Sequence, residues 1–192
     1  KNQMLSYARK SLEIKDTINI RYFLGRYYIE YDQDYEKAYG HLKICEEQHM
    51  DFPWTYFYIA RCKEKFKEPE KALSYYEKVM ELNPDFRDCL WRMGLIWRNK
   101  FNRTLQTEYA DKALYYLNQQ EERFGIFTDL HRWRSYIWLS LGNYEKALAE
   151  TQKGLEREED SGLWILKGRA LRKLDRYEES IKSFEESIHC ED

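Results

Sequence analysis

Small and larger residues recur along this chain with the spacing of one face of an α-helix. Ala72 is followed four positions later by the larger Tyr76 and seven positions later by the slender Val79. Positions separated by four and seven residues lie on the same side of a helix. The pattern therefore predicts a helix with one closely packed face, and it recurs at the small residues Ala38, Ala113, Ala147 and Ser180.

A second helical pattern, with a small residue of its own, precedes each of these segments. Ala60 lies twelve residues before Ala72, and Gly168 lies twelve before Ser180. In the first segment Gly25 stands thirteen residues ahead of its anchor, so we expect that helix to be out of register by one. Small residues at fixed places on both helices would allow the two backbones to approach closely.

Short polar segments separate the two helical patterns. Lys67-Glu68-Pro69 is one example, and Pro69 suits the first turn of a helix, where its missing N–H costs nothing. Asn83-Pro84-Asp85 closes the second unit, because proline cannot continue a helix and restricts the residue before it. Each unit is thus predicted to be a helix, a tight turn, a second helix and a short link.

The units repeat with a nearly constant period. The pentapeptide DYEKA at 34–38 recurs as EPEKA, YADKA, NYEKA and RYEES, at intervals of 34, 41, 34 and 33 residues. Helix pairs with this period resemble the tetratricopeptide repeat family. Two units carry the resemblance best: the last through Trp164, Gly168, Tyr177, Ser180, Phe184 and Ser187, and the second through Ile59, Ala60, Ala72, Tyr76, Val79 and Pro84.

The resemblance implies an all-α fold, a right-handed superhelical solenoid of antiparallel helix pairs that forms one domain. Residues 1–18 are predicted to be the second helix of a preceding repeat, so we expect the chain to be an excised fragment. Five repeats follow, at 19–52, 53–86, 87–127, 128–160 and 161–192. The third has seven extra residues between Trp97 and Ala113, which either extend a helix by about two turns or lengthen a surface loop.

Composition supports this interpretation and narrows the location. With 8 Gly and 3 Pro in 192 residues, the chain lacks the turn residues of a β-sandwich or barrel. A net charge of −2 does not favour general nucleic-acid binding, and no apolar run is long enough to span a bilayer. Four cysteines without a CxxC pair, and no signal-peptide pattern in residues 1–25, predict reduced thiols in a cytoplasmic protein.

The candidates for chemistry are weak. His41, Cys45 and His49 have the spacing of metal ligands on one helix, but Cys45 occupies a small packing position, so we predict no metal site. Glutamate pairs such as Glu46-Glu47 fall on outer helix faces, and the sequence has neither a phosphate-binding glycine loop nor a nucleophile elbow. The sequence therefore predicts a protein that is not an enzyme and uses no cofactor.

The resemblance also implies a concave groove lined by the first helix of each repeat. Helical periodicity predicts which positions point into the groove, and these positions hold seven basic and four acidic residues. The excess of positive charge leads us to expect an acidic or carboxylate-bearing partner. In the first repeat the same count selects Phe23 and Tyr27. In the other four the predicted peptide-binding residues are Trp54, Phe57, Arg61, Trp91, Arg98, Arg132, Tyr136, Arg169 and Arg172.

One alternative to these predictions remains open for the groove. Under it, Trp54, Phe57 and Trp91 only pack against the next repeat or against a missing neighbour. Some family members clamp acidic chaperone tails with lysines and asparagines, and that specific clamp is not predicted here. Its places hold Phe57, Tyr58, Arg61 and Arg92, and the asparagines are absent.

The predicted function is a protein–protein interaction scaffold that binds a peptide or helix of a partner protein in the groove. The alternative is a substrate-recruiting or regulatory region of a larger enzyme or regulator, whose chemistry lies outside these residues. Self-association through the ends of the array is a third hypothesis, since terminal repeats normally need a polar cap.

Overall fold

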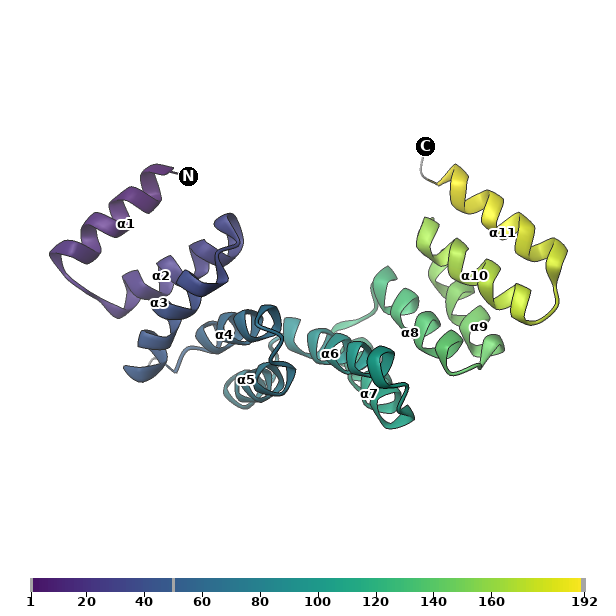
Figure 1. Cartoon of the computed structure of the whole chain (residues 1–192), viewed down its shortest axis with the longest axis horizontal. Coiled ribbons are helices and arrows are strands. Elements are labelled where there is room, and N and C mark those ends of the chain that lie inside the picture. Colours follow the sequence, from purple (N-terminus) through teal and green to yellow (C-terminus); the bar gives the residue numbers. More distant parts are fainter. Residues whose placement is uncertain (1, 50, 191–192) are drawn as a thin grey trace. The chain divides into compact units, whose positions relative to one another are not determined.

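The computed structural model describes residues 2–49 and 51–190, which contain helices and no β-strand (Figure 1). This confirms the predicted all-α class. A π-helical turn, η1 (Tyr28–Asp32), continues the second helix. In chain order the α-helices are α1 (Asn2–Ile14), α2 (Ile18–Tyr27), α3 (Tyr35–Glu47), α4 (Pro53–Lys65), α5 (Pro69–Leu82), α6 (Asp88–Thr104), α7 (Thr107–Phe124), α8 (Thr128–Ser140), α9 (Tyr144–Leu155), α10 (Ser161–Lys173) and α11 (Tyr177–His189).

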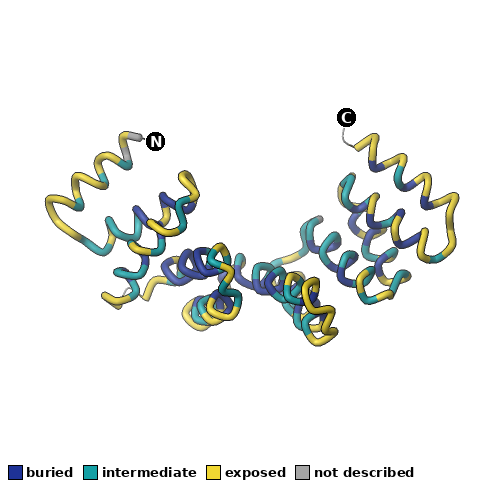
Figure 2. Tube along the Cα trace, viewed as in Figure 1, coloured by how far each residue is buried: buried dark blue, intermediate teal, exposed yellow. Residues whose placement is uncertain are grey.

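The helices form two compact units, Lys1–Cys89 and Leu90–Asp192. In the first unit α2 packs on α3, α3 on α4 and α4 on α5; in the second, α8, α9, α10 and α11 pack in the same serial way. Burial follows this stacking, because α4 holds a long run of buried residues whereas α1 and α11 are largely exposed (Figure 2). Serial packing of helix pairs is the arrangement of a helical solenoid.

Small residues lie where paired helices come closest. A Cβ added at Gly25 would lie 2.5 Å from Leu42 Cγ, and one added at Gly168 would lie 2.8 Å from Phe184 Cε1. Real Cβ atoms do not approach other atoms so closely, so a larger residue at either position would push the helices apart. The predicted packing face of the helix pairs is therefore confirmed at these positions.

The π-helical turn explains the irregular spacing in the first repeat. A π turn holds an extra residue compared with an α turn, and η1 lies between Gly25 and its anchor Ala38. Gly25 therefore still faces α3 although it lies thirteen residues before the anchor. The assignment of Phe23 and Tyr27 to the groove is wrong by one residue, and Tyr27 is buried.

The seven extra residues of the third repeat lengthen its helices. Helices α6 and α7 have 17 and 18 residues, against 13 and 12 in α8 and α9 of the next repeat. Phe101, near the end of α6, belongs to a buried cluster with Ala110 and Leu114 of α7. Of the two alternatives left by the sequence, the structure has the longer helix.

Overpacking at a helix crossing should destabilise the fold. Ala147 on α9 is fully buried, and Ala149 on the same helix is exposed. We expect Ala147→Leu to lower the free energy of unfolding by about 1–3 kcal/mol, because a well-packed core cannot accept the added atoms without strain. Ala149→Leu adds the same atoms on the surface and should change it by less than about 0.5 kcal/mol. Urea unfolding followed by circular dichroism measures both, and equal midpoints would contradict the packing described above.

Candidate peptide-binding surfaces

The predicted groove residues fall into both compact units, and the two sets are described separately. Trp54, Phe57 and Arg61 lie on α4 in the first unit. The second unit holds the others, on α6, α8 and α10: Trp91, Arg98, Arg132, Tyr136, Arg169 and Arg172.

Phe57 belongs to the core of the first unit. Its side chain is 3% exposed, with its ring centroid 5.0 Å from that of Phe86 and 5.8 Å from that of Tyr76. The prediction that Phe57 lines a ligand groove is therefore wrong. Helical periodicity placed Phe57 on this side of α4, but Phe86 from the following link covers its ring. Phe57 therefore supports the surface from beneath.

Trp54 is partly exposed and firmly held. Its ring contacts those of Phe57, Tyr58 and Phe86 at centroid distances of 5.5, 5.9 and 4.6 Å, and the residue remains 38% exposed. Arg61 places its guanidinium 5.9 Å from the ring centroid of Tyr58, within the range of a cation–π interaction. Trp54 thus offers a fixed aromatic edge next to a positive charge.

Two further residues, which the sequence analysis missed, extend this aromatic region. Tyr22 of α2 lies 5.3 Å from Phe52 and 6.3 Å from Tyr58, measured between ring centroids. Phe52, in the link before α4, is 40% exposed. The register of Gly25 could have revealed Tyr22, because aligning Gly25 with Ala60 puts Tyr22 in the place of Phe57. We call Tyr22, Phe52, Trp54 and Arg61 the aromatic surface, which the buried Tyr58 supports from beneath.

Polar contacts hold the helices beneath the aromatic surface. The hydroxyl of Tyr58 donates a 2.5 Å hydrogen bond to Glu30 Oε1, and Glu30 also pairs with Arg26 at 3.0 Å. Burial raises the pKa of Tyr58, and the neighbouring Glu30 carboxylate raises it further, so its hydroxyl stays protonated as a donor. Because Tyr58 comes from α4 and Glu30 from η1, this bond ties the first repeat to the second.

In the second unit Trp91 contributes to helix packing. Its ring is stacked on that of Trp133 of α8 at a centroid distance of 5.6 Å, and the Arg92 guanidinium lies 4.5 Å from the Trp91 centroid. The residue as a whole is only partly buried. Trp91 therefore packs against α8, as the alternative interpretation expected. Its contact with a ligand stays a prediction.

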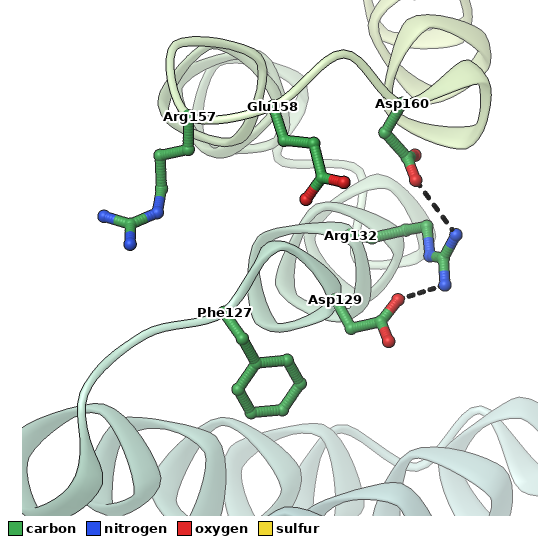
Figure 3. A pocket seen from close by; sticks show the side chains of 6 residues that line it. All are labelled: Phe127, Asp129, Arg132, Arg157, Glu158 and Asp160. Atoms are coloured by element: carbon green, nitrogen blue, oxygen red, sulfur yellow. Dashed lines mark hydrogen bonds and ion pairs between the residues drawn. The ribbon is translucent and has the colours of Figure 1, made fainter.

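Arg132 is already paired with two carboxylates. It donates to Asp129 of its own helix and, at 3.3 Å, to Asp160 in the link before α10 (Figure 3). These residues line an open cavity of about 540 Å³ together with Phe127, Arg157 and Glu158. Arg132 is therefore not a free receptor for a ligand anion, because carboxylates of the chain itself neutralise its charge.

The remaining basic residues of the second unit differ in exposure. Arg169 and Arg172 of α10 are exposed, and no carboxylate of the described chain pairs with either. Arg98 of α6 is partly buried, and burial lowers the pKa of its guanidinium, as does the nearby charge of Arg132, whereas Tyr136 opposes the change. We call Arg98, Arg169 and Arg172 the basic residues of the second unit.

A buried polar network fixes α8, which carries Arg132 and Tyr136. Arg134 donates to the Leu117 carbonyl at 3.0 Å and pairs with Glu121 at 2.6 Å, both on α7. His131 Nδ1 lies 2.9 Å from Glu150 Oε2 on α9. Burial acts to raise the pKa of Glu150, but the hydrogen bond with His131 and the positive charge of Arg134 outweigh this effect. The pKa of the carboxyl therefore lies below its usual range.

The metal candidate of the sequence has a packing role. Cys45 is buried, with its sulfur 3.5 Å from the Ile18 carbonyl oxygen, and burial raises the pKa of the thiol to about 11. Among residues 2–49 and 51–190, no group of three His, Cys, Asp or Glu side chains could hold a metal ion. No helix in the described chain is long and apolar enough to cross a membrane.

Antiparallel helix pairs that stack in series, with small residues where they cross, define a helical repeat scaffold. Residues 54–85 and 161–188 match models described as "Tetratricopeptide repeat". These two segments of the chain are therefore tetratricopeptide repeats. Because it carries these repeats, the chain is a protein–protein interaction scaffold.

Comparison with known proteins agrees with this family. The photosystem I assembly protein Ycf3 of Acaryochloris marina (strain MBIC 11017) is 26% identical over 129 residues, which cover 66% of this chain and 72% of that protein. MamA from Desulfovibrio magneticus RS-1, in a structure that begins at its residue 41, has a TM-score of 0.77 at 14% identity and covers 91% of this chain and 94% of its own. TTC0263, a thermophilic TPR protein of Thermus thermophilus, has a TM-score of 0.64 at 16% identity, with 90% and 91% covered. At these identities the solved structures establish the fold.

Proposed function

We propose that the chain binds an extended or helical segment of a partner protein against the first helices of its repeats. The observation that carries this proposal is the aromatic surface, where Phe52 and Trp54 are exposed yet held in place by neighbouring rings. Rigid aromatic residues beside arginine are enriched among the residues that dominate binding energy at protein interfaces. Because these rings are already ordered, a partner would lose little affinity to ordering them.

The partner is proposed to be acidic. Arg169 and Arg172 are exposed and unpaired with carboxylates in the described chain, and Arg98 lies in the same unit. Exposed positive charges accelerate association with an acidic segment, an effect that salt screens. The name of the Acaryochloris relative describes an assembly protein, and bringing partner proteins together is a role that such surfaces suit. A recruiting region of a larger enzyme, the alternative hypothesis, would use the same residues.

Trp54 should be essential for partner binding. The partner segment is identified by crosslinking mass spectrometry and then titrated against purified variants. We expect Trp54→Ala to weaken the Kd by at least tenfold, because it removes an ordered aromatic contact of about 2 kcal/mol. Tyr115→Ala, at a 59% exposed tyrosine on the second helix α7, is the matched control and should leave the Kd unchanged. If only Tyr115→Ala weakens binding, the ligand lies on the second helices and the proposal fails.

A further inference from the structure

Arg98 is an arginine without a counter-charge. Its Nε is fully buried and makes no hydrogen bond, and its Nη2 donates only to the neutral side chain of Asn99 at 3.2 Å. Buried ionised groups in proteins are normally paired, because removing a charge from water costs free energy that a partner must offset. An arginine keeps its proton under all ordinary conditions, so Arg98 cannot escape this cost by becoming neutral.

The surroundings of Arg98 do not supply the missing charge. The groups whose charge acts on it are Arg132, which repels it, and Tyr136, which is neutral at pH 7. The two carboxylates that hold Arg132, Asp129 and Asp160, are committed to that residue. In the described chain no carboxylate pairs with Arg98.

Two cations that are buried more completely than Arg98 are paired with carboxylates. Arg134 has Glu121 and the Leu117 carbonyl, and Lys63 has Glu68 at 3.2 Å. The fold therefore supplies partners for cations that serve structure. A charge left unpaired at a partly buried position is expected where an external group completes it.

Neighbouring side chains would suit a ligand at this place. Trp91 and Arg98 are seven residues apart on α6 and therefore lie on one face of that helix. Trp91 is stacked on Trp133 of α8, the helix that also carries Tyr136. The stacked rings of Trp91 and Trp133 and the phenolic hydroxyl of Tyr136 thus come from α6, which carries the Arg98 guanidinium, and from α8.

We propose that Arg98 and Tyr136 form a subsite for the side-chain carboxylate of an aspartate or glutamate in the partner segment. The planar guanidinium matches a carboxylate, and a single unpaired positive charge matches a monoanion. A phosphate group, with nearly two negative charges, would also be repelled by Asp129 and Asp160 beside Arg132. This subsite rests on the proposed function, since it names the group that the second unit receives.

The first test measures thermal unfolding without any partner. Arg98→Met removes the unpaired charge and keeps an unbranched apolar side chain, so we expect it to raise the melting temperature by about 2–4 °C. Arg103→Met, at an exposed arginine on the same helix, removes the same charge and should leave the melting temperature unchanged. A lower melting temperature for Arg98→Met would show that Arg98 serves structure and would overturn the proposal.

The second test uses acetylated and amidated hexapeptides of glutamate, glutamine or phosphoserine, titrated into ¹⁵N-labelled whole chain. We expect the hexaglutamate peptide to shift the Arg98 Nε–Hε resonance, and the hexaglutamine peptide to leave it in place. Arg98→Met should weaken hexaglutamate binding at least tenfold, and Arg103→Met should not. Equal binding by wild type and Arg98→Met overturns the subsite, and tighter binding of the phosphoserine peptide overturns its assignment to a carboxylate. Neither result depends on Trp54, so a failure here is distinct from a failure of the proposed function.

Discussion

Replacing Arg134 with methionine should lower the free energy of unfolding by about 3 kcal/mol, the lower end of the range for breaking a buried ion pair. Arg134 is almost fully buried, and its guanidinium connects Glu121 and the Leu117 carbonyl of α7 with the neighbourhood of Glu150 on α9. Its loss leaves the largely buried Glu150 carboxylate with His131 and the exposed Lys153 as its remaining partners. The lower end applies because Glu121 is 44% exposed and water can replace its partner.

Urea unfolding followed by far-ultraviolet circular dichroism measures this change. Arg157→Met is the matched control, because Arg157 is an exposed arginine in the link after α9 and removing it takes away the same charge. We expect its midpoint to stay within the error of wild type. An Arg134→Met midpoint equal to that of Arg157→Met would show that the network contributes nothing to the packing of α8.

Phe101→Ala should be more costly, lowering the free energy of unfolding by about 3–5 kcal/mol. Phe101 is 1% exposed and packs in the cluster with Ala110 and Leu114, within the part of the third repeat that holds the extra residues. Removing its ring leaves a cavity that the two long helices cannot close without moving apart. The insertion would thus be shown to build the core of the second unit.

Leu105→Ala is the control for Phe101→Ala. Leu105 lies in the turn between α6 and α7 and is 69% exposed, so its truncation removes apolar atoms without opening a cavity. We expect a change below about 0.5 kcal/mol in the same urea experiment. If both variants unfold at the wild-type midpoint, the extra residues form a surface extension that the core does not need.

The two stability predictions also bear on binding, because they concern α6 and α8, the helices that hold Arg98 and Tyr136. Arg98 lies three residues before Phe101 on α6, and Tyr136 lies two residues after Arg134 on α8. A loss of packing at either helix should therefore weaken recognition of an acidic segment without touching it. Comparing the ligand affinity of Arg134→Met and Arg157→Met separates this indirect effect from simple loss of charge.

The sequence by itself determined the class of fold and of function. Helix periodicity and the recurring small residues are local properties of the sequence. Residues such as Ala72 and Gly168 are small because two closely packed helices leave no room for a larger side chain where they cross. They predicted the paired helices and their packing face, and the period identified the repeat family. The exposed Trp54 next to Arg61 was also correctly located on the first helix of its repeat.

Only the tertiary structure decided which side chains on the first helices are accessible to a ligand. One residue is a rotation of about 100° around a helix, so the π turn after Gly25 was enough to exchange Tyr22 for Phe23. Burial of Phe57 depends on Phe86, 29 positions further along, and pairing of Arg132 depends on Asp160, 28 positions away. Residues from distant parts of the chain set the charge and the exposure of a site. A periodic sequence pattern is local and does not encode these long-range contacts.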